Sequence, residues 1–260
     1  MTQPITNEHP DIAANESALK LFAKLDPSLI AFMLDVDGTL IDIGPSPFEV
    51  DVPESLKETL VKLYELSGGA LALVSGRPIR DLDLLFAPLK LPSVGGHGAE
   101  QRLMGAPVSR VENLPEAMRH QLITAATPGS GIEYEDKGYS VALHFRKALH
   151  EEERLQAHIQ ETRRAFPTVD TEVLPGKAMF EVKSPGINKG DGVRALMTKP
   201  PFEGRSPVFI GDDVTDEAAF GAMPEFGGLA FSVGFRFEDA AGMFSEPEQV
   251  RLALRRMAGL

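Results

Sequence analysis

Two aspartates, one residue apart, end an apolar run of strand length early in the chain. The run covers residues 29–34, and it is followed by Asp35, Asp37 and then Gly38-Thr39. Neighbouring carboxylates need a cation or a shared proton to coexist, and a hard divalent ion with oxygen ligands meets that need. The spacing therefore predicts a Mg²⁺ site at Asp35 and Asp37. An acidic turn is the alternative, since Asp and Gly are ordinary turn residues.

Three further motifs carry groups that could handle a phosphate or a metal. They are SGR at 75–77, NKG at 188–190 and GDDVTDE at 211–217. Each alone has a simpler explanation: a turn, a solvated lysine, or an aspartate pair capping a helix. Together they describe a phosphate site. It has a carboxylate nucleophile, a second carboxylate for proton transfer, a hydroxyl and a lysine for phosphoryl oxygens, and further carboxylates for a metal.

The elements that must position these motifs follow a strand-helix alternation. Short apolar strands are predicted at 29–34, 70–74, 91–94, 208–210 and 227–233, with helices at 17–25, 53–66, 191–197 and 247–257, and further helices beginning at 78 and 215. Such alternation indicates a parallel, doubly wound sheet. In open sheets of this kind ligands bind outside the carboxyl ends of the strands, which is where the four motifs fall.

The pattern changes between about 106 and 182. Segments 139–145 and 178–183 alternate as half-exposed strands, which suits an antiparallel sheet, and helices are predicted at 115–125 and 151–166. We therefore expect an α/β fold with a Rossmann-like doubly wound parallel sheet core and an inserted smaller α+β cap domain. The expected boundaries are 1–27 for a tail and short helix, 28–105 and 186–260 for the core, and 106–185 for the cap.

Composition narrows the function classes. The net charge of −12 argues against nucleic-acid binding, and no apolar run approaches the length of a membrane span. The absence of cysteine and of an apolar N-terminal segment favours a cytoplasmic protein. We expect a monomer that acts on a small molecule and has neither a nucleic-acid nor a membrane partner.

In this order and spacing, the four motifs resemble those of the haloacid dehalogenase-like phosphohydrolase superfamily. The resemblance implies that Asp35 is the nucleophile that forms an aspartyl-phosphate, and that Asp37 is the general acid/base. It further implies that the phosphoryl group is bound by Ser75, Gly76, Arg77 and Lys189.

The same resemblance implies the ligands of Mg²⁺. Asp35 and Asp212 would bind the ion, Asp213 or Asp216 would assist directly or through water, and Asp37 would contribute its backbone carbonyl. Which of Asp213 and Asp216 touches the metal is left open.

Within that superfamily the chain looks most like the trehalose-6-phosphate phosphatase family. The similarity lies in GDDVTDE, the turn at 95–100, and two segments of the predicted cap at 133–146 and 181–190. It implies a sugar site formed by Glu135, Lys137, Ser140, His144, Arg146, Glu181 and His97. The turn at 95–98 lacks the acidic residue that the family carries before this histidine.

The resemblance implies a Mg²⁺-dependent phosphatase that converts trehalose 6-phosphate to trehalose and phosphate. Two alternatives stay open. The substrate could be another sugar phosphate, such as sucrose phosphate or mannosyl-phosphoglycerate. The chain could also be a non-catalytic sugar-phosphate sensor, although a pure binder needs no nucleophile.

Overall fold

The computed structural model describes residues 12–44, 50–176 and 178–260. The chain forms two compact units, one of Met1–Ser109 with Asn188–Leu260 and one of Arg110–Ile187. We call the first the core unit and the second the inserted unit. The boundaries expected for the cap, 106 and 185, lie four and two residues from the ends of the inserted unit.

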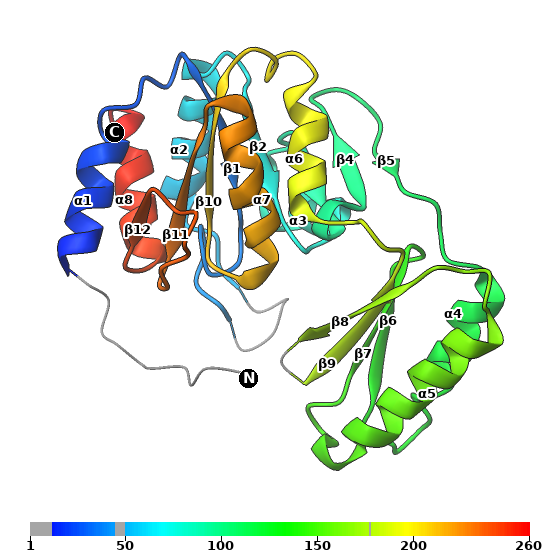
Figure 1. Ribbon diagram of the computed structural model, residues 1–260. Coiled ribbons are helices and arrows are strands. Elements are labelled where there is room, and N and C mark those ends of the chain that lie inside the picture. Colours follow the sequence, from blue (N-terminus) through cyan, green and yellow to red (C-terminus); the bar gives the residue numbers. More distant parts are fainter. Residues whose placement is uncertain (1–11, 45–49, 177) are drawn as a thin grey trace. The chain divides into compact units, whose positions relative to one another are not determined.

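An eight-stranded sheet organises the core unit (Figure 1). Its order is β12-β11-β10-β1-β2-β3-β4-β5, with parallel pairs from β12 to β3 and an antiparallel pair between β3 and β4. The chain moves outward from β1 through β2 to β3, and outward on the other side from β10 through β11 to β12, so the winding reverses between β1 and β10. These strands are β1 (Ile30–Leu34), β2 (Leu71–Val74), β3 (Ser93–Gly95), β4 (Glu100–Arg102), β5 (Ser109–Arg110), β10 (Ser206–Gly211), β11 (Leu229–Val233) and β12 (Gly242–Phe244).

Alternating residues of the parallel strands build two cores, one on each face of the sheet. Phe32 and Leu34 of β1 belong to the cluster that includes Leu60 of α2 and Leu254 of α8. Met33 belongs to the opposite cluster, with side chains of α6 and α7. Burial on both faces explains why these strands are continuous apolar runs. The core helices are α1 (Ile12–Phe22), α2 (Glu54–Leu66), α3 (Ile79–Leu85), α6 (Lys189–Met197), α7 (Glu217–Ala222) and α8 (Pro247–Met257).

The inserted unit is a four-stranded antiparallel sheet with order β6-β7-β9-β8. Val141, Leu143 and Val182 of this sheet pack with Leu122 and Leu155 of two helices, so one face is covered. The elements are α4 (Glu116–Ile123), β6 (Glu133–Asp136), β7 (Ser140–His144), α5 (Glu152–Ala165), β8 (Glu172–Gly176) and β9 (Met179–Lys183).

The predicted α/β architecture, a parallel sheet with helices on both faces, is confirmed, with differences at its edges. Helix α1 begins at Ile12, not at Ser17, so residues 12–17 are helical where a loose tail was predicted; residues 1–11 lie outside the described part. Strands β4, β5 and β12 are only two or three residues long and carry too little pattern for a period to be recognised. In the described part of the chain, each helix is too short or too polar to cross a membrane.

Candidate active site

Three neighbouring strands of the core sheet bring predicted site residues to one edge. Asp35 directly follows β1, Ser75 follows β2 and Asp212 follows β10, and these strands lie in the order β10-β1-β2. Parallel pairing holds the junctions in place: the amide of Asp35 donates to the carbonyl of Ile210 at 2.9 Å, and that of Ser75 to Val94 at 2.8 Å. The site therefore lies at the carboxyl ends of the strands, beside the point where the winding reverses.

Lys189 reaches this edge from the first residue of α6. The helix is capped by Asn188, whose side chain accepts from the amide of Asp191 at 2.9 Å. The ammonium of Lys189 donates to Asp35 Oδ1 at 2.7 Å and to Asp216 Oδ1 at 2.6 Å. All three side chains are buried, so the lysine is a fixed charge between two carboxylates.

Three carboxylates, two of them buried and one half-buried, form a cluster suited to a cation. Asp35, Asp212 and Asp216 each offer an oxygen, and these oxygens lie within 4.8 Å of one another. Thr39 Oγ1 donates to Asp212 Oδ1 at 3.0 Å and so orients that carboxylate. Oxygen-only donors of this kind fit a hard ion such as Mg²⁺.

Asp213 and Asp216 are arranged differently around this cluster. Asp216 Oδ2 accepts from the backbone amides of Asp212 and Asp213, each at 3.0 Å, so Asp216 holds the loop that carries Asp212. The exposed side chain of Asp213 caps the short 3₁₀ helix Val214–Asp216 by accepting from the amide of Val214 at 2.7 Å. The structure places Asp216, and not Asp213, in the carboxylate cluster.

Burial and crowding shift the ionisation of this cluster. Burial raises the pKa of Asp35 to about 7, with Lys189 opposing and Asp212 adding to the rise. Burial likewise raises the pKa of Asp216 to about 6 and that of Asp212 above its usual range. Burial lowers the pKa of Lys189, but Asp35 and Asp216 outweigh it, so its pKa lies above the ordinary value. The lysine therefore stays charged. Its single positive charge does not balance three carboxylates, so a second cation would stabilise their ionised forms.

Asp37 lies apart from the cluster, bound to Arg77. The guanidinium Nε donates to Asp37 Oδ2 at 2.6 Å and Nη2 donates to Oδ1 at 2.5 Å. The predicted general acid/base and one predicted phosphate ligand are thus paired with each other.

Two glycines of the motifs lie so close to a neighbouring side chain that no larger residue would fit. Gly38 has φ of +77°, and a Cβ there would collide with the Asp212 carboxylate. A Cβ on Gly76 would collide with the ring of His97, which therefore lies against the loop after β2. The amide of His97 also donates to the carbonyl of Ser75 at 3.0 Å, so this predicted sugar residue is part of the core site.

Four of the predicted sugar residues of the inserted unit lie on one side of its sheet. Because side chains alternate along a strand, Ser140 and His144 of β7 lie opposite to the residues that pack on α4 and α5. Glu181 of β9 shares that face, since it pairs with Ala142, and Glu135 of β6 pairs with the same alanine.

A hydrogen-bonded network links four of these residues. Lys137 Nζ lies 3.2 Å from Glu181 Oε1 and 3.8 Å from Glu135 Oε2. Ser140 Oγ donates to the same Glu181 oxygen at 2.6 Å. Glu181 is buried and Glu135 is 39% exposed in its side chain, so Glu135 is the carboxylate with room for a ligand.

His144 is the last residue of β7, and Arg146 follows it in the next turn. Partial burial lowers the pKa of His144, against the opposite effect of Glu135. The imidazole is therefore neutral at neutral pH and can both donate and accept a hydrogen bond. Arg146 lies beyond the end of β7 and is exposed.

Comparison with known proteins assigns the chain to a family. The trehalose-phosphatase family model matches residues 33–242, which is more than half of the sequence. The trehalose-6-phosphate phosphatase of Escherichia coli (strain K12) is 37% identical over 238 residues, covering 90% of this chain and 83% of that protein. The chain belongs to the trehalose-phosphatase family. It is therefore a phosphatase, as the resemblance of its motifs implied.

Solved structures support the fold of this trehalose-phosphatase chain. The C-terminal domain of the Candida albicans trehalose-6-phosphate phosphatase has a TM-score of 0.75 at 21% identity, covering 98% of this chain and all of that one. A phosphatase of the haloalkanoate (HAD) superfamily from Bacteroides thetaiotaomicron has a TM-score of 0.62 at 16% identity, covering 91% and 98%. The predicted superfamily fold is confirmed.

The structure gives a role to some residues of this trehalose-phosphatase site for which the sequence predicts none. Thr39 lies within DVDGT, but its bond to Asp212 depends on contacts across the sheet. Asn188 lies within NKG, and the Asn-x-x-Asp spacing is a helix-cap signal that could have identified it. The pairing of Arg77 with Asp37 has no local sequence signal, because forty positions separate the two residues.

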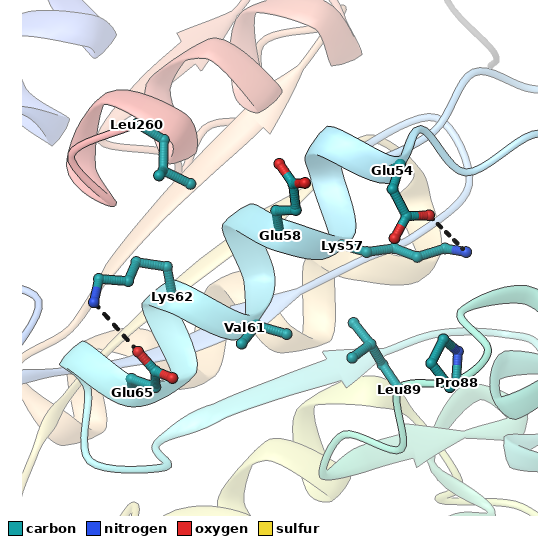
Figure 2. Close-up of a pocket in the computed structure, with 9 residues that line it drawn as sticks. All are labelled: Glu54, Lys57, Glu58, Val61, Lys62, Glu65, Pro88, Leu89 and Leu260. Atoms are coloured by element: carbon teal, nitrogen blue, oxygen red, sulfur yellow. Dashed lines mark hydrogen bonds and ion pairs between the residues drawn. The ribbon is translucent and has the colours of Figure 1, made fainter.

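A hollow elsewhere on the trehalose-phosphatase core has no part in this chemistry. Its lining side chains come mostly from α2, together with Pro88, Leu89 and Leu260 (Figure 2). The volume of the hollow is about 470 Å³. Its charged rim is largely paired internally, since Lys62 lies 3.3 Å from Glu65 and Lys57 lies 3.5 Å from Glu54. It contains none of the predicted site residues.

Proposed function

We propose that this chain hydrolyses trehalose 6-phosphate to trehalose and phosphate with the help of Mg²⁺. The observation that carries the proposal is the meeting of Asp35 and Asp212, at the carboxyl ends of β1 and β10, with the buried Lys189 of α6. The name of the Escherichia coli relative supplies the substrate.

Asp35, Asp212 and Asp216 are the residues that would hold Mg²⁺, because their oxygens converge and carry more negative charge than Lys189 can balance. The bound ion would neutralise the charge that builds up when a carboxylate meets a phosphate monoester. Asp216 already accepts from Lys189 and from two backbone amides. Within this set we therefore assign direct metal contact to Asp35 and Asp212, and the orientation of Asp212 to Asp216.

The first step is phosphoryl transfer to Asp35. A carboxylate oxygen of Asp35 attacks phosphorus, and the bond between phosphorus and the sugar oxygen breaks with its electron pair going to that oxygen. Asp37 supplies the proton that the leaving alkoxide needs. Lys189 and the hydroxyl of Ser75 hold the phosphoryl oxygens during the transfer.

The second step is hydrolysis of the aspartyl-phosphate. A water oxygen attacks phosphorus, the bond from phosphorus to the Asp35 oxygen breaks, and Asp37 takes the proton from the water. Phosphate leaves, and both aspartates return to their starting states. Covalent capture divides one difficult displacement into two easier ones.

The inserted unit supplies recognition of the sugar in this proposal. A disaccharide carries many hydroxyls and no charge besides its phosphate. Carboxylates are strong acceptors for hydroxyl groups, and Glu135 is the more exposed carboxylate of the network around Lys137. His144 lies on the same side of the sheet, and the exposed Arg146 follows two residues later in the chain.

Phosphate release from trehalose 6-phosphate, with Mg²⁺ and with EDTA, tests the proposal. We expect turnover that EDTA abolishes and added Mg²⁺ restores. A parallel panel of sucrose 6-phosphate, glucose 6-phosphate and mannosyl-phosphoglycerate measures selectivity. Faster turnover of another sugar phosphate in this panel would make that compound the substrate. Binding of a sugar phosphate without any phosphate release would favour a sensor.

The working form in this proposal is a monomer in the cytoplasm. The support is the lack of cysteine and the acidic surface charge, which disfavours self-association. Size-exclusion chromatography with light scattering gives the mass directly, and a mass twice that of the chain would contradict the monomer.

A further inference from the structure

Arg77 and Asp37 form a bidentate ion pair, which we call the clamp. Both carboxylate oxygens of Asp37 accept from Arg77, from Nε at 2.6 Å and from Nη2 at 2.5 Å. Two parallel bonds fix the plane of a carboxylate, which a single bond from a lysine cannot do. Asp37 needs such a partner because 36% of its side chain is exposed.

The backbone of Arg77 is held from several directions. Its amide donates to Ser75 Oγ at 3.1 Å, and its carbonyl accepts from the amide of Gly96 at 2.9 Å. A Cβ on Gly95 would press against the same carbonyl, so the strand after α3 packs closely on this turn. Pro78 follows directly and fixes the start of α3. Arg77 is therefore a rigid support for the side chain it holds.

Asp37 lies on a turn that gives it a fixed backbone and a rotatable side chain. The amide of the next residue, Gly38, donates to the carbonyl of Ile41 at 2.8 Å, and Asp37 forms an isolated bridge with Ile41. The backbone position is therefore set. What remains variable is the direction of the carboxylate, and proton transfer depends strongly on that direction.

We propose that Arg77 is a positioning residue for Asp37 and not a ligand of the transferred phosphate. This inference rests on the proposed phosphatase function and revises the phosphate-binding role that the resemblance implied for Arg77. The clamp aims the Asp37 carboxylate at the leaving oxygen of the sugar phosphate, while Lys189 and Ser75 bind the phosphoryl group.

The two roles predict different substrate dependence. A sugar alkoxide is a poor leaving group that needs the proton from Asp37, whereas p-nitrophenolate leaves unaided. The value of kcat/KM reports the steps up to the first irreversible one, here the transfer to Asp35. A positioning residue should therefore affect kcat/KM for the sugar phosphate alone, and a phosphate ligand should affect both substrates.

The experiment compares Arg77→Ala and Arg77→Lys with wild type in saturating Mg²⁺. For Arg77→Ala we expect kcat/KM to fall about 100-fold or more with trehalose 6-phosphate. With p-nitrophenyl phosphate, and in the inhibition constant of inorganic phosphate, we expect changes below about threefold. Arg77→Lys should have a kcat/KM for trehalose 6-phosphate less than about tenfold above that of Arg77→Ala, because lysine restores the charge but not the two parallel hydrogen bonds.

A matched control is available in the same unit. Arg102 forks onto Asp83, from Nη1 at 2.7 Å and Nη2 at 2.6 Å, and is as buried as Arg77. Arg102→Ala loses an equivalent ion pair outside the site, so it should change stability like Arg77→Ala and leave both activities within about twofold of wild type.

The double variant Asp37→Asn with Arg77→Ala completes the test. If Arg77 acts through Asp37, the second substitution adds nothing to the first. Equal losses on both substrates, a raised inhibition constant for phosphate, or additive losses in the double variant would each overturn the inference. Wild-type protein that releases no phosphate from trehalose 6-phosphate would overturn the proposed function instead, so the two failures are distinguishable.

Discussion

Asp35 is a residue whose burial is costly to the fold and whose proposed role is that of the nucleophile. It is buried beside Asp212 and Asp216, and Lys189 is the cation that pairs with Asp35 and Asp216 in the described part of the chain. Asp35→Asn should reduce phosphate release by more than 1000-fold, an order of magnitude typical for loss of a nucleophile. Its melting temperature in EDTA should not fall, because a buried charge is removed. Asp83→Asn serves as a control, and turnover of Asp35→Asn within tenfold of wild type would refute the nucleophile.

The ionisation of Asp35 also predicts how stability varies with pH. Its pKa is about 7 in the folded state and about 3.9 in an unfolded chain. A group whose pKa rises on folding contributes stability that is complete below the unfolded pKa and is lost as the pH rises through the folded pKa. In EDTA we therefore expect the free energy of unfolding to fall between about pH 4 and pH 7, by up to about 4 kcal/mol from this group.

Urea unfolding across that pH range measures the slope. Asp35→Asn should flatten it, while Asp83→Asn should retain it. A free energy of unfolding that rises with pH over this window in the wild type would contradict the assignment. Asp216, with a pKa of about 6, adds to the slope at the acidic end.

For individual residues, the sequence predicts which residue types form the site better than it predicts which side chains contact each other. Asp35, Lys189 and Asp212 could be predicted because each belongs to a motif at the end of a strand or the start of a helix. The choice of Asp216 over Asp213 for the cluster could not, because it depends on which way a short 3₁₀ turn points two adjacent carboxylates. Pairings such as that of Arg77 with Asp37 form only once separate loops meet.

Among the elements, the turn after β1 offers a sharp steric test. Gly38 and Gly204 share a φ of +77°, but only at Gly38 would a Cβ collide with a neighbour, the Asp212 carboxylate. Both Gly→Ala variants should lose about 1 kcal/mol from the strained backbone. Gly38→Ala should in addition displace Asp212 and weaken Mg²⁺ binding at least tenfold, measured by activation of turnover. Unchanged activation in Gly38→Ala would show that Asp212 does not need this approach.

The exposed side of the inserted sheet offers a second test. Loss of a hydrogen bond to a charged group costs about 1.5–3 kcal/mol, so Glu135→Ala should lower kcat/KM for trehalose 6-phosphate roughly 10- to 150-fold. Hydrolysis of p-nitrophenyl phosphate should be almost unchanged. Asp136 is a matched control, because it lies on the other face of β6 and pairs with Arg119 of α4. Equal losses on both substrates in Glu135→Ala would assign Glu135 to the fold.

Helices and strands could be predicted from the sequence where a periodic apolar pattern extends over many residues. The helix at 53–66 and the closing helix at 247–257 appear within one residue of their predicted bounds. The strand β6 was missed because its sequence, Glu-Tyr-Glu-Asp, has little apolar content, and its existence depends on pairing with β7. Tertiary pairing, and not local preference, makes that segment a strand.

For the molecule as a whole, net charge should govern encounter with the substrate. The charge of −12 repels a phosphate dianion over distances that salt can screen. At saturating Mg²⁺, raising NaCl to 0.15 M shortens the screening length to about 8 Å, and we expect kcat/KM for trehalose 6-phosphate to rise about twofold. Stopped-time phosphate assays along a salt series measure this. A steady fall would mean that the local cations dominate the approach.

The position of β1 in the sheet has a consequence for how the protein matures. Its register with β10 pairs Leu34 with Ile210, so the partner strand is synthesised 176 residues later, roughly 10 to 35 s at ribosomal speeds. All four strands of the inserted unit lie between Glu133 and Lys183 and leave the ribosome before β10 does. During that interval one edge of β1 has no partner and is open to pairing with other nascent chains. Asp35, the proposed nucleophile, is therefore translated well before the strand that completes its site.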